Sequence, residues 1–252
     1  MGMFDLTGKR AIVTGAASGL SKGIAEGLME AGASVVIIDI SARTGEAAAE
    51  FCRRGFKAYG VQADLGNRES LDAAFDQAVG LLGGGLDIMV PAAGIQRRSR
   101  SEEFSMDDWD AVLNINLSAV FRLCQLAGRL FLKQKSGKII NIASMLSFFG
   151  GYTVPAYAAS KGGVAQLTKA LSNEWAQYGI NVNAIAPGYM DTQMNTGLIA
   201  DEARNAQITA RIPARRWGTP EDMKGTAVFL ASPASDYLNG AVIPVDGGYL
   251  GC

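Results

Sequence analysis

The stretch "RAIVTGAASGLSKG", residues 10–23, joins a run of strand-forming residues to a glycine-rich turn and then to the start of a helix. A strand, a glycine turn and a helix in this order form the fingerprint that places a dinucleotide pyrophosphate at a helix N-terminus. Glycine alone is weak support, because tight turns need its conformational freedom for reasons of their own. The stretch therefore predicts a dinucleotide site if the rest of the chain continues the same fold.

Apolar runs and helical segments alternate along the rest of the chain. Runs that suit short buried strands lie at 10–15, 34–39, 57–62, 86–90, 137–144, 180–186 and 241–246. Segments with helical spacing lie at 19–31, 41–54, 67–82, 106–134, 155–178 and 219–231. This alternation predicts one α/β domain over residues 1–252, with a doubly wound parallel sheet whose ligands bind beyond the carboxyl ends of the strands.

Composition excludes several classes of function. Lys and Arg number 23 against 24 Asp and Glu, so no net field attracts nucleic acid or an anionic membrane, and neither partner is expected. The chain has no histidine, which excludes histidine-based triads and histidine-ligated metal. The three cysteines are far apart and lack metal-ligand spacing, and no signal core or run of 18 apolar residues occurs, so we expect a soluble cytoplasmic protein without metal.

Two carboxylates follow the second and third predicted strands. Asp39 ends the second strand, where it can accept hydrogen bonds from the adenosine ribose of a coenzyme and would repel a 2′-phosphate. Asp64 follows the third strand, from which a side chain could reach the adenine. Either residue alone could be an ordinary turn former. Together with the glycine loop they favour NAD over NADP as the coenzyme.

Four polar side chains supply an acid-base system that does not need histidine. Tyr157 and Lys161 stand at i and i+4, on one face of a predicted helix, although such pairs are common on solvated helices. Ser144 leaves the preceding strand, and Asn116 lies in the long helix before it. The ammonium of Lys161 and an oxidised nicotinamide would favour phenolate at Tyr157, Ser144 would hold the substrate oxygen, and Asn116 could anchor a water next to Lys161.

The chain resembles the short-chain dehydrogenase/reductase family over essentially its whole length. The matching motifs are "TGAASGL" with Asp39 and Asp64, "AAG" at 92–94, "LNINL", "INIAS", "YAASK", "NAIAPGYMDT" and the terminal "VDGGY". The resemblance implies a Rossmann-type, three-layer sheet of seven parallel strands, hydride transfer at a nicotinamide and a homotetramer. It also implies coenzyme contacts at Gly15, Ser18, Gly19, Leu20, Asp39, Asp64, Leu65, Ala93, Gly94, Tyr157, Lys161, Pro187, Gly188 and Thr192.

Two departures from the family pattern flank the predicted coenzyme site. Ser21 stands where the family's TGxxxGxG loop has its last glycine, and Pro91 and Ala92 replace two asparagines. A serine at a helix start can cap free amides or reach a phosphate, but its side chain should crowd the backbone, so we expect weakened coenzyme binding. Gly23 should not compensate, because positions two apart do not share a helix face. These departures keep a catalytically weak nucleotide-binding protein as an alternative.

Within the family, the chain is most similar to the sugar-acid branch of 2-dehydro-3-deoxy-D-gluconate and gluconate 5-dehydrogenases. Arg97 and Arg98 follow a strand exit and could bind a substrate carboxylate, or they could be a solvated basic run. Met145 and Tyr152 could wall the substrate pocket, or pack elsewhere. The insertion at about 188–218 suits a substrate lid or an extra surface helix. The other enzymatic alternative is a 3-oxoacyl-carrier-protein reductase, which should prefer NADPH.

Overall fold

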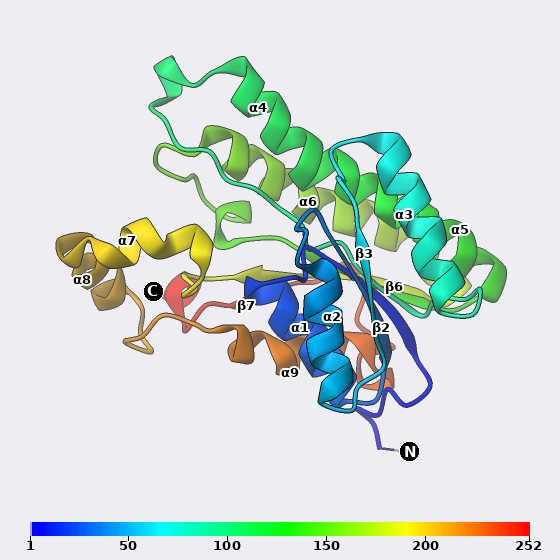
Figure 1. Cartoon of the computed structure of the whole chain (residues 1–252). Helices are drawn as coiled ribbons and strands as arrows, with labels where there is room; N and C mark the ends of the chain where they lie inside the picture. Colours follow the sequence, from blue (N-terminus) through cyan, green and yellow to red (C-terminus); the bar gives the residue numbers. More distant parts are fainter. Residues whose placement is uncertain (1) are drawn as a thin grey trace.

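Seven parallel strands form one sheet in the order β3-β2-β1-β4-β5-β6-β7. The computed structural model describes residues 2–252 and confirms the predicted doubly wound fold (Figure 1). The strands are β1 Arg10–Thr14, β2 Ser34–Asp39, β3 Ala58–Gln62, β4 Ile88–Val90, β5 Gly137–Ile142, β6 Ile180–Pro187 and β7 Val242–Val245. The helices are α1 Gly19–Glu30, α2 Thr44–Arg53, α3 Arg68–Leu81, α4 Met106–Leu113, α5 Ala119–Gln134, α6 Pro155–Trp175, α7 Thr196–Ala200, α8 Glu202–Arg211 and α9 Pro220–Ala231.

Helices cover both faces of the sheet, which is why its central strands are apolar throughout. Successive side chains of a strand point to opposite faces. Ile12 of β1 therefore joins the apolar core beneath α3, α5 and α6, whereas its neighbour Val13 joins the core beneath α1, α2 and α9. Both residues are fully buried. The central strands thus read as continuous apolar runs, the pattern on which the predicted strands rest.

The order of the strands reverses beside β1, and this places the site. Ile12 pairs with Val36 of β2 on one side and with Met89 of β4 on the other. Connections from β1 and β4 leave toward opposite faces of the sheet, so a crevice remains between them at the carboxyl ends. The glycine loop after β1 and the "AAG" segment after β4 border this crevice.

Close packing of α1 on α9 occurs at Gly23, not at Ser21, which stands at the last glycine position of the family's loop. A Cβ atom added to Gly23 would lie 2.6 Å from the carbonyl oxygen of Pro220, at the start of α9. Gly23 therefore lets α1 and α9 approach backbone to backbone. Ser21 faces the end of β4 instead, as expected for positions two apart on a helix.

The predicted helix over 106–134 is continuous but not uniform. A π-helical turn, Asn114–Ser118, separates α4 from α5 and contains Asn116. Such turns occur mostly as single bulges in α-helices, frequently at functional sites. By length and composition Met106–Gln134 could cross a membrane, but α5 packs one face into the protein core with Leu123, Cys124 and Phe131.

Candidate active site

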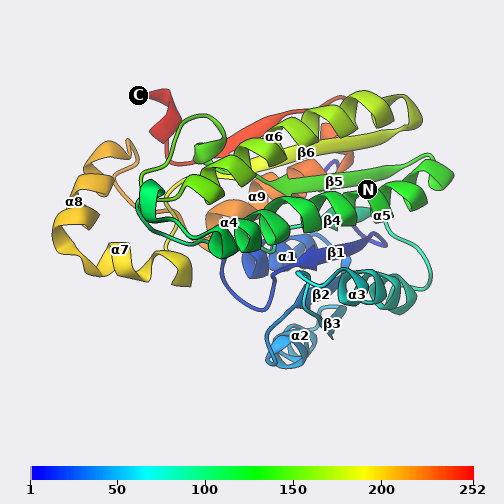
Figure 2. The same cartoon turned by 90° about the horizontal axis from the view of Figure 1, so that it is seen from above.

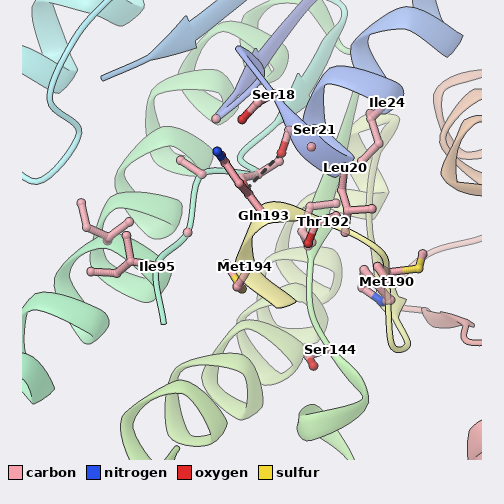
Figure 3. Close-up of a pocket in the computed structure, with 18 of the residues that line it drawn as sticks. Ser18, Leu20, Ser21, Ile24, Ile95, Ser144, Met190, Thr192, Gln193 and Met194 are labelled. Carbon is pink, nitrogen blue, oxygen red and sulfur yellow. Dashed lines mark hydrogen bonds between the residues drawn. The ribbon is translucent and has the colours of Figure 1, made fainter. Parts of the chain in front are cut away.

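A cavity of about 450 Å³ lies at the carboxyl ends of β1, β4, β5 and β6 (Figure 3). It adjoins the point where the strand order reverses, so its place follows from the topology of the sheet. Every residue that the sequence predicts to contact a coenzyme lines it. These residues are Gly15, Ser18, Gly19, Leu20, Asp39, Asp64, Leu65, Ala93, Gly94, Tyr157, Lys161, Pro187, Gly188 and Thr192.

The two glycines of the loop have different roles. Gly15 and Gly19 have φ angles of 68° and 62°, in the left-handed region that favours glycine. A Cβ atom on Gly15 would lie 2.8 Å from the Cα atom of Ala93, so Gly15 permits close contact between two loops. A Cβ atom on Gly19 would meet no atom within 4 Å. The N-terminus of α1 is thus open to an anion, and the residues present fit a dinucleotide pyrophosphate.

The loop after β4 is tied to β1 in spite of its unusual sequence. β4 ends at Val90, so Pro91 lies just beyond the strand and removes no hydrogen bond from its ladder. The Thr14 hydroxyl accepts hydrogen bonds from the backbone N–H groups of Ala92 and Ala93, at 2.9 and 3.0 Å. These two bonds fix the segment that replaces the family's asparagines.

Ser21 does not cap α1. Ser18 is the N-cap residue, and Ser21 lies in the first turn, nine-tenths buried. Its hydroxyl donates a long hydrogen bond of 3.4 Å to the carbonyl oxygen of Ala92. The expectation that the Ser21 oxygen accepts from free helix amides is therefore wrong, because the side chain points toward β4 rather than along the helix end.

Asp39 uses both carboxylate oxygens to order its own loops. One oxygen accepts from the N–H group of Ala17 in the glycine loop, and the other accepts from the N–H group of Ser41, each at 3.0 Å. Asp64 similarly accepts from the N–H group of Gly66 at 2.8 Å. Both carboxylates line the cavity, at the end where β2 and β3 finish.

Tyr157 and Lys161 project from one face of α6 into the cavity. The Lys161 ammonium lies 5.6 Å from the centre of the Tyr157 ring and donates a 2.6 Å hydrogen bond to the Ile142 carbonyl. Burial lowers the pKa of Lys161 to about 8. Burial also raises the pKa of the Tyr157 phenol, while its interaction with Ser144 acts in the opposite direction. In the protein alone, burial is the larger influence on the phenol.

Ser144 lies two residues beyond the end of β5, in the cavity wall next to α6. It is the N-cap of the 3₁₀ turn Met145–Ser147, and its hydroxyl accepts from the N–H group of Leu146 at 3.1 Å. The side chain is mostly buried. Ser144, Tyr157 and Lys161 thus meet at one end of the cavity, although they come from two elements.

Asn116 lies behind this cluster and does not line the cavity. Its amide oxygen accepts from the N–H group of Ile95 at 2.8 Å, and its amide nitrogen donates to the Ile95 carbonyl at 2.9 Å. The nitrogen also donates to the hydroxyl of Ser160 at 3.3 Å. Asn116 therefore clamps the backbone at Ile95, a residue of the cavity wall.

The residues predicted to bind substrate do not line the cavity. Arg97 is half-exposed and pairs with Asp108 at 3.2 Å, and Arg98 is exposed. Met145 packs in a small apolar cluster with Ile208. Tyr152 is 84% exposed on the surface loop that precedes α6. The structure thus brings the predicted coenzyme residues and Ser144, Tyr157 and Lys161 to one cavity, but not the predicted substrate residues.

Several residues of the 188–218 insertion line the cavity without having been predicted individually. Gln193, Met194 and Asn195 line the cavity, and Figure 3 shows Gln193 and Met194 near Thr192. The insertion itself was recognisable as a candidate lid, but its sequence has no motif that selects these positions. Figures 1 and 2 both show α7 and α8 of this insertion standing out at one edge of the molecule, near the C-terminus.

The base of the insertion is anchored to the C-terminal segment. Residues Met190 and Gly218 form a β-bridge that closes it, and Ala214 N–H donates to the Gly247 carbonyl at 3.0 Å. The ring of Tyr249 lies 4.7 Å from the Arg211 guanidinium at the end of α8. The terminal "VDGGY" motif thus forms the surface on which the insertion packs.

Comparisons with known proteins agree with this geometry. A family model described as Enoyl-(Acyl carrier protein) reductase matches residues 15–250. The 2-dehydro-3-deoxy-D-gluconate 5-dehydrogenase of Escherichia coli (strain K12) is 50% identical over 248 residues, which cover 98% of this chain and 97% of that protein.

Two solved structures share the fold closely. The gluconate 5-dehydrogenase from Burkholderia cenocepacia J2315, in complex with NADP and tartrate, is 41% identical with a TM-score of 0.95, over 99% of this chain and 98% of that one. A short-chain type dehydrogenase/reductase from Mycobacterium marinum is 35% identical with a TM-score of 0.92, over 98% of this chain and 97% of that one. With such identities over nearly its whole length, this protein belongs to the short-chain dehydrogenase/reductase family.

Proposed function

We propose that this protein interconverts a secondary alcohol and a ketone on a sugar acid of the deoxy-ketogluconate type, with a nicotinamide coenzyme. The observation that carries the proposal is the meeting of Ser144, Tyr157 and Lys161 at one end of the cavity. The identity to sugar-acid dehydrogenases supports the substrate class.

The glycine loop would hold the coenzyme pyrophosphate at the N-terminus of α1. Pro187, Gly188 and Thr192 would hold the carboxamide end of the nicotinamide, and Lys161 would bind its ribose. When bound, the coenzyme supplies the hydride acceptor or donor. The protein's own residues must then orient the substrate and move a single proton.

Tyr157 is the acid-base group of the proposed reaction. In the oxidation direction its phenolate accepts the proton of the substrate hydroxyl, and in reduction the phenol returns it. Burial opposes the phenolate, so a nearby positive charge must compensate. With a pKa of about 8, Lys161 carries that charge at neutral pH. Ser144 holds the substrate oxygen in place by a hydrogen bond.

Asn116 would support this cluster in two ways. Its clamp on Ile95 fixes one wall of the cavity. Both hydrogens of its amide nitrogen are used, so only a lone pair on the amide oxygen is left for the water that we expect next to Lys161. Such a water would connect the ammonium to solvent.

For the substrate carboxylate we propose Arg97 and Arg98, and for the wall of the substrate pocket Met145 and Tyr152. Arg97 shares its guanidinium with Asp108, whereas among residues 2–252 Arg98 has no ion-pair partner. The 188–218 insertion would act as a lid that closes over the bound substrate and excludes water. A cytoplasmic homotetramer remains the proposed form.

NAD is the proposed coenzyme, on the strength of Asp39. Its carboxylate lines the cavity, and at the end of β2 it would accept from the adenosine ribose, whereas a 2′-phosphate there would face a negative charge. The relative from Burkholderia binds NADP, so the preference needs a direct comparison. Equal affinities of the protein for NADH and NADPH would contradict the role given to Asp39.

One assay series tests the proposed function. The purified protein is offered 2-dehydro-3-deoxy-D-gluconate, gluconate, uncharged sugars and an acyl-thioester ketone, each with NAD(H) and NADP(H). We expect turnover confined to sugar acids and fastest with NAD(H). Activity only on thioester ketones with NADPH would identify the acyl-carrier reductase alternative. Coenzyme binding without turnover on any substrate would favour a nucleotide-binding protein.

A further inference from the structure

The hydroxyl of Ser147 contacts the backbones of two residues of the proposed catalytic cluster. It accepts a hydrogen bond from the N–H group of Ser144 at 3.3 Å and donates one to the carbonyl oxygen of Lys161 at 2.6 Å. A serine hydroxyl has one hydrogen to donate and lone pairs to accept with. One side chain thus joins the turn after β5 to the middle of α6.

The local sequence explains how Ser147 comes to this place. Ser144 and Ser147 form a capping box around the 3₁₀ turn, in which the side chain at each end of the turn accepts a hydrogen bond from a backbone N–H group at the other end. The N–H group of Ser147 also donates to the Ser144 carbonyl at 2.9 Å. With the turn closed by both backbone and side chain, the Ser147 hydroxyl has little freedom except to face α6.

Lys161 is held at both ends by the same stretch of chain. Its ammonium donates to the carbonyl of Ile142, at the end of β5, and its own carbonyl accepts from Ser147. These two hydrogen bonds, together with the bond from the Ser144 N–H group to Ser147, connect the chain segment from Ile142 to Ser147 with Lys161. Removing the Ser147 hydroxyl would break its bond to the Lys161 carbonyl and leave the Ser144 N–H group without its side-chain acceptor.

We propose that Ser147 is a positioning residue that sets the spacing between Ser144 and the Tyr157–Lys161 face of α6. The proposal rests on the proposed function, because the spacing matters where Ser144 and Tyr157 handle one substrate oxygen. Ser147 itself does not line the cavity, so its effect must pass through its two backbone partners. The interaction of Ser144 with the Tyr157 phenol depends directly on this spacing.

The test compares three variants, Ser147→Ala, Ser147→Thr and Ser235→Ala. Thr keeps a hydroxyl at position 147. Ser235 is a matched control, because its buried hydroxyl also donates its one hydrogen to a backbone carbonyl, with those of Leu230 and Ser232 within reach at 3.0 and 3.1 Å. It lies near the amino ends of β5 and β6, away from the cavity. Each variant is assayed for kcat, for coenzyme dissociation constant by fluorescence, and for the pH profile of alcohol oxidation.

We expect Ser147→Ala to lower kcat about tenfold, the effect of losing one hydrogen bond from a positioned group. Its pH profile should move to higher pH, since a displaced Ser144 no longer favours phenolate. Coenzyme affinity should stay within about twofold of the wild type, because the glycine loop is untouched. Ser147→Thr should restore both kcat and the profile, and Ser235→Ala should leave both unchanged.

An unchanged kcat and pH profile in Ser147→Ala would overturn the proposal, as would an equal loss in Ser235→Ala. A crystal structure of Ser147→Ala gives a readout that needs no substrate. We expect the turn at Ser144 to shift away from α6, and an unmoved turn also rejects the positioning role. If the wild type oxidises no sugar acid, the proposed function fails on that result alone, and the crystal structure still decides the role of Ser147.

Discussion

The hydroxyl of Ser21 lies 3.4 Å from the carbonyl oxygen of Ala92. Ser21 and Ala92 are two of the positions at which the chain departs from the family pattern, and the sequence places them 71 residues apart. The structure shows that they contact each other across the gap between α1 and β4. Their two departures are therefore one local feature of the cavity wall rather than independent defects.

Replacing Ser21 tests what this contact does. Ser21→Gly removes the side chain that crowds the loop, so we expect coenzyme to bind two- to fivefold more tightly, while the protein loses about 1–2 kcal/mol of stability from the lost bond and the added glycine. Ser21→Ala keeps the Cβ atom, so it should lose about 1 kcal/mol without tighter binding. Fluorescence titration with NADH and urea unfolding measure the two effects. Weaker binding by Ser21→Gly would show that the serine side chain supports the coenzyme.

The Tyr157 phenol can be removed without disturbing the cavity. Tyr157→Phe keeps the ring next to Lys161 but cannot accept or return a proton, so kcat should fall by about 10²–10⁴-fold. Coenzyme affinity should change by less than about twofold, because the ring packing remains. Steady-state kinetics with a sugar acid and fluorescence titration check both values. A variant with near-normal kcat would exclude Tyr157 as the acid-base group.

Burial of Lys161 makes the free energy of unfolding of the coenzyme-free protein depend on pH. Its pKa falls from 10.5 to about 8 on burial. Between these values the unfolded chain binds more protons than the folded one, so this group makes the free energy of unfolding rise with pH over that window. Below about pH 8 both states are charged, and the burial cost is fully present.

Lys161→Met isolates this contribution from the other titrating groups. The free energy of unfolding of the wild type, minus that of Lys161→Met, should increase between pH 7.5 and about pH 10. Urea unfolding at three pH values measures it. A difference that does not change with pH would mean that Lys161 keeps its ordinary pKa in the folded protein.

The sequence predicts those site residues whose positions follow directly from strand ends, glycine turns and helix periodicity. The glycine loop, Asp39 and the pair Tyr157 and Lys161 are fixed by strand ends and helix periodicity, and the structure brings them to one cavity. The contact of Ser21 with Ala92 was not predictable, since it depends on the crossing of α1 and β4. The placement of Arg97 beside Asp108 likewise depends on side-chain packing between a loop and α4, which spacing does not encode.

The insertion shows the same limit. Its length and position suit a lid or an extra surface helix, but the way it is held depends on Tyr249, 38 residues after Arg211 in the sequence. The Arg211 guanidinium lies 4.7 Å from the centre of the Tyr249 ring. The Phe149 ring stacks on the Tyr249 ring at 6.1 Å, and the Tyr189 ring makes a T-shaped contact with it at 5.5 Å. Tyr249 thus contacts both the insertion and the loop that follows Ser144.

This arrangement predicts that Tyr249 controls the release of coenzyme. Tyr249→Leu removes the stacking surface for Arg211 and Phe149, so the insertion should open more readily, and because Thr192 and Gln193 line the cavity, coenzyme should leave about three- to tenfold faster. Tyr249→Phe keeps the ring and should resemble the wild type. Stopped-flow fluorescence of NADH release measures the rates. A Tyr249→Leu rate equal to that of the wild type would contradict this role of Tyr249.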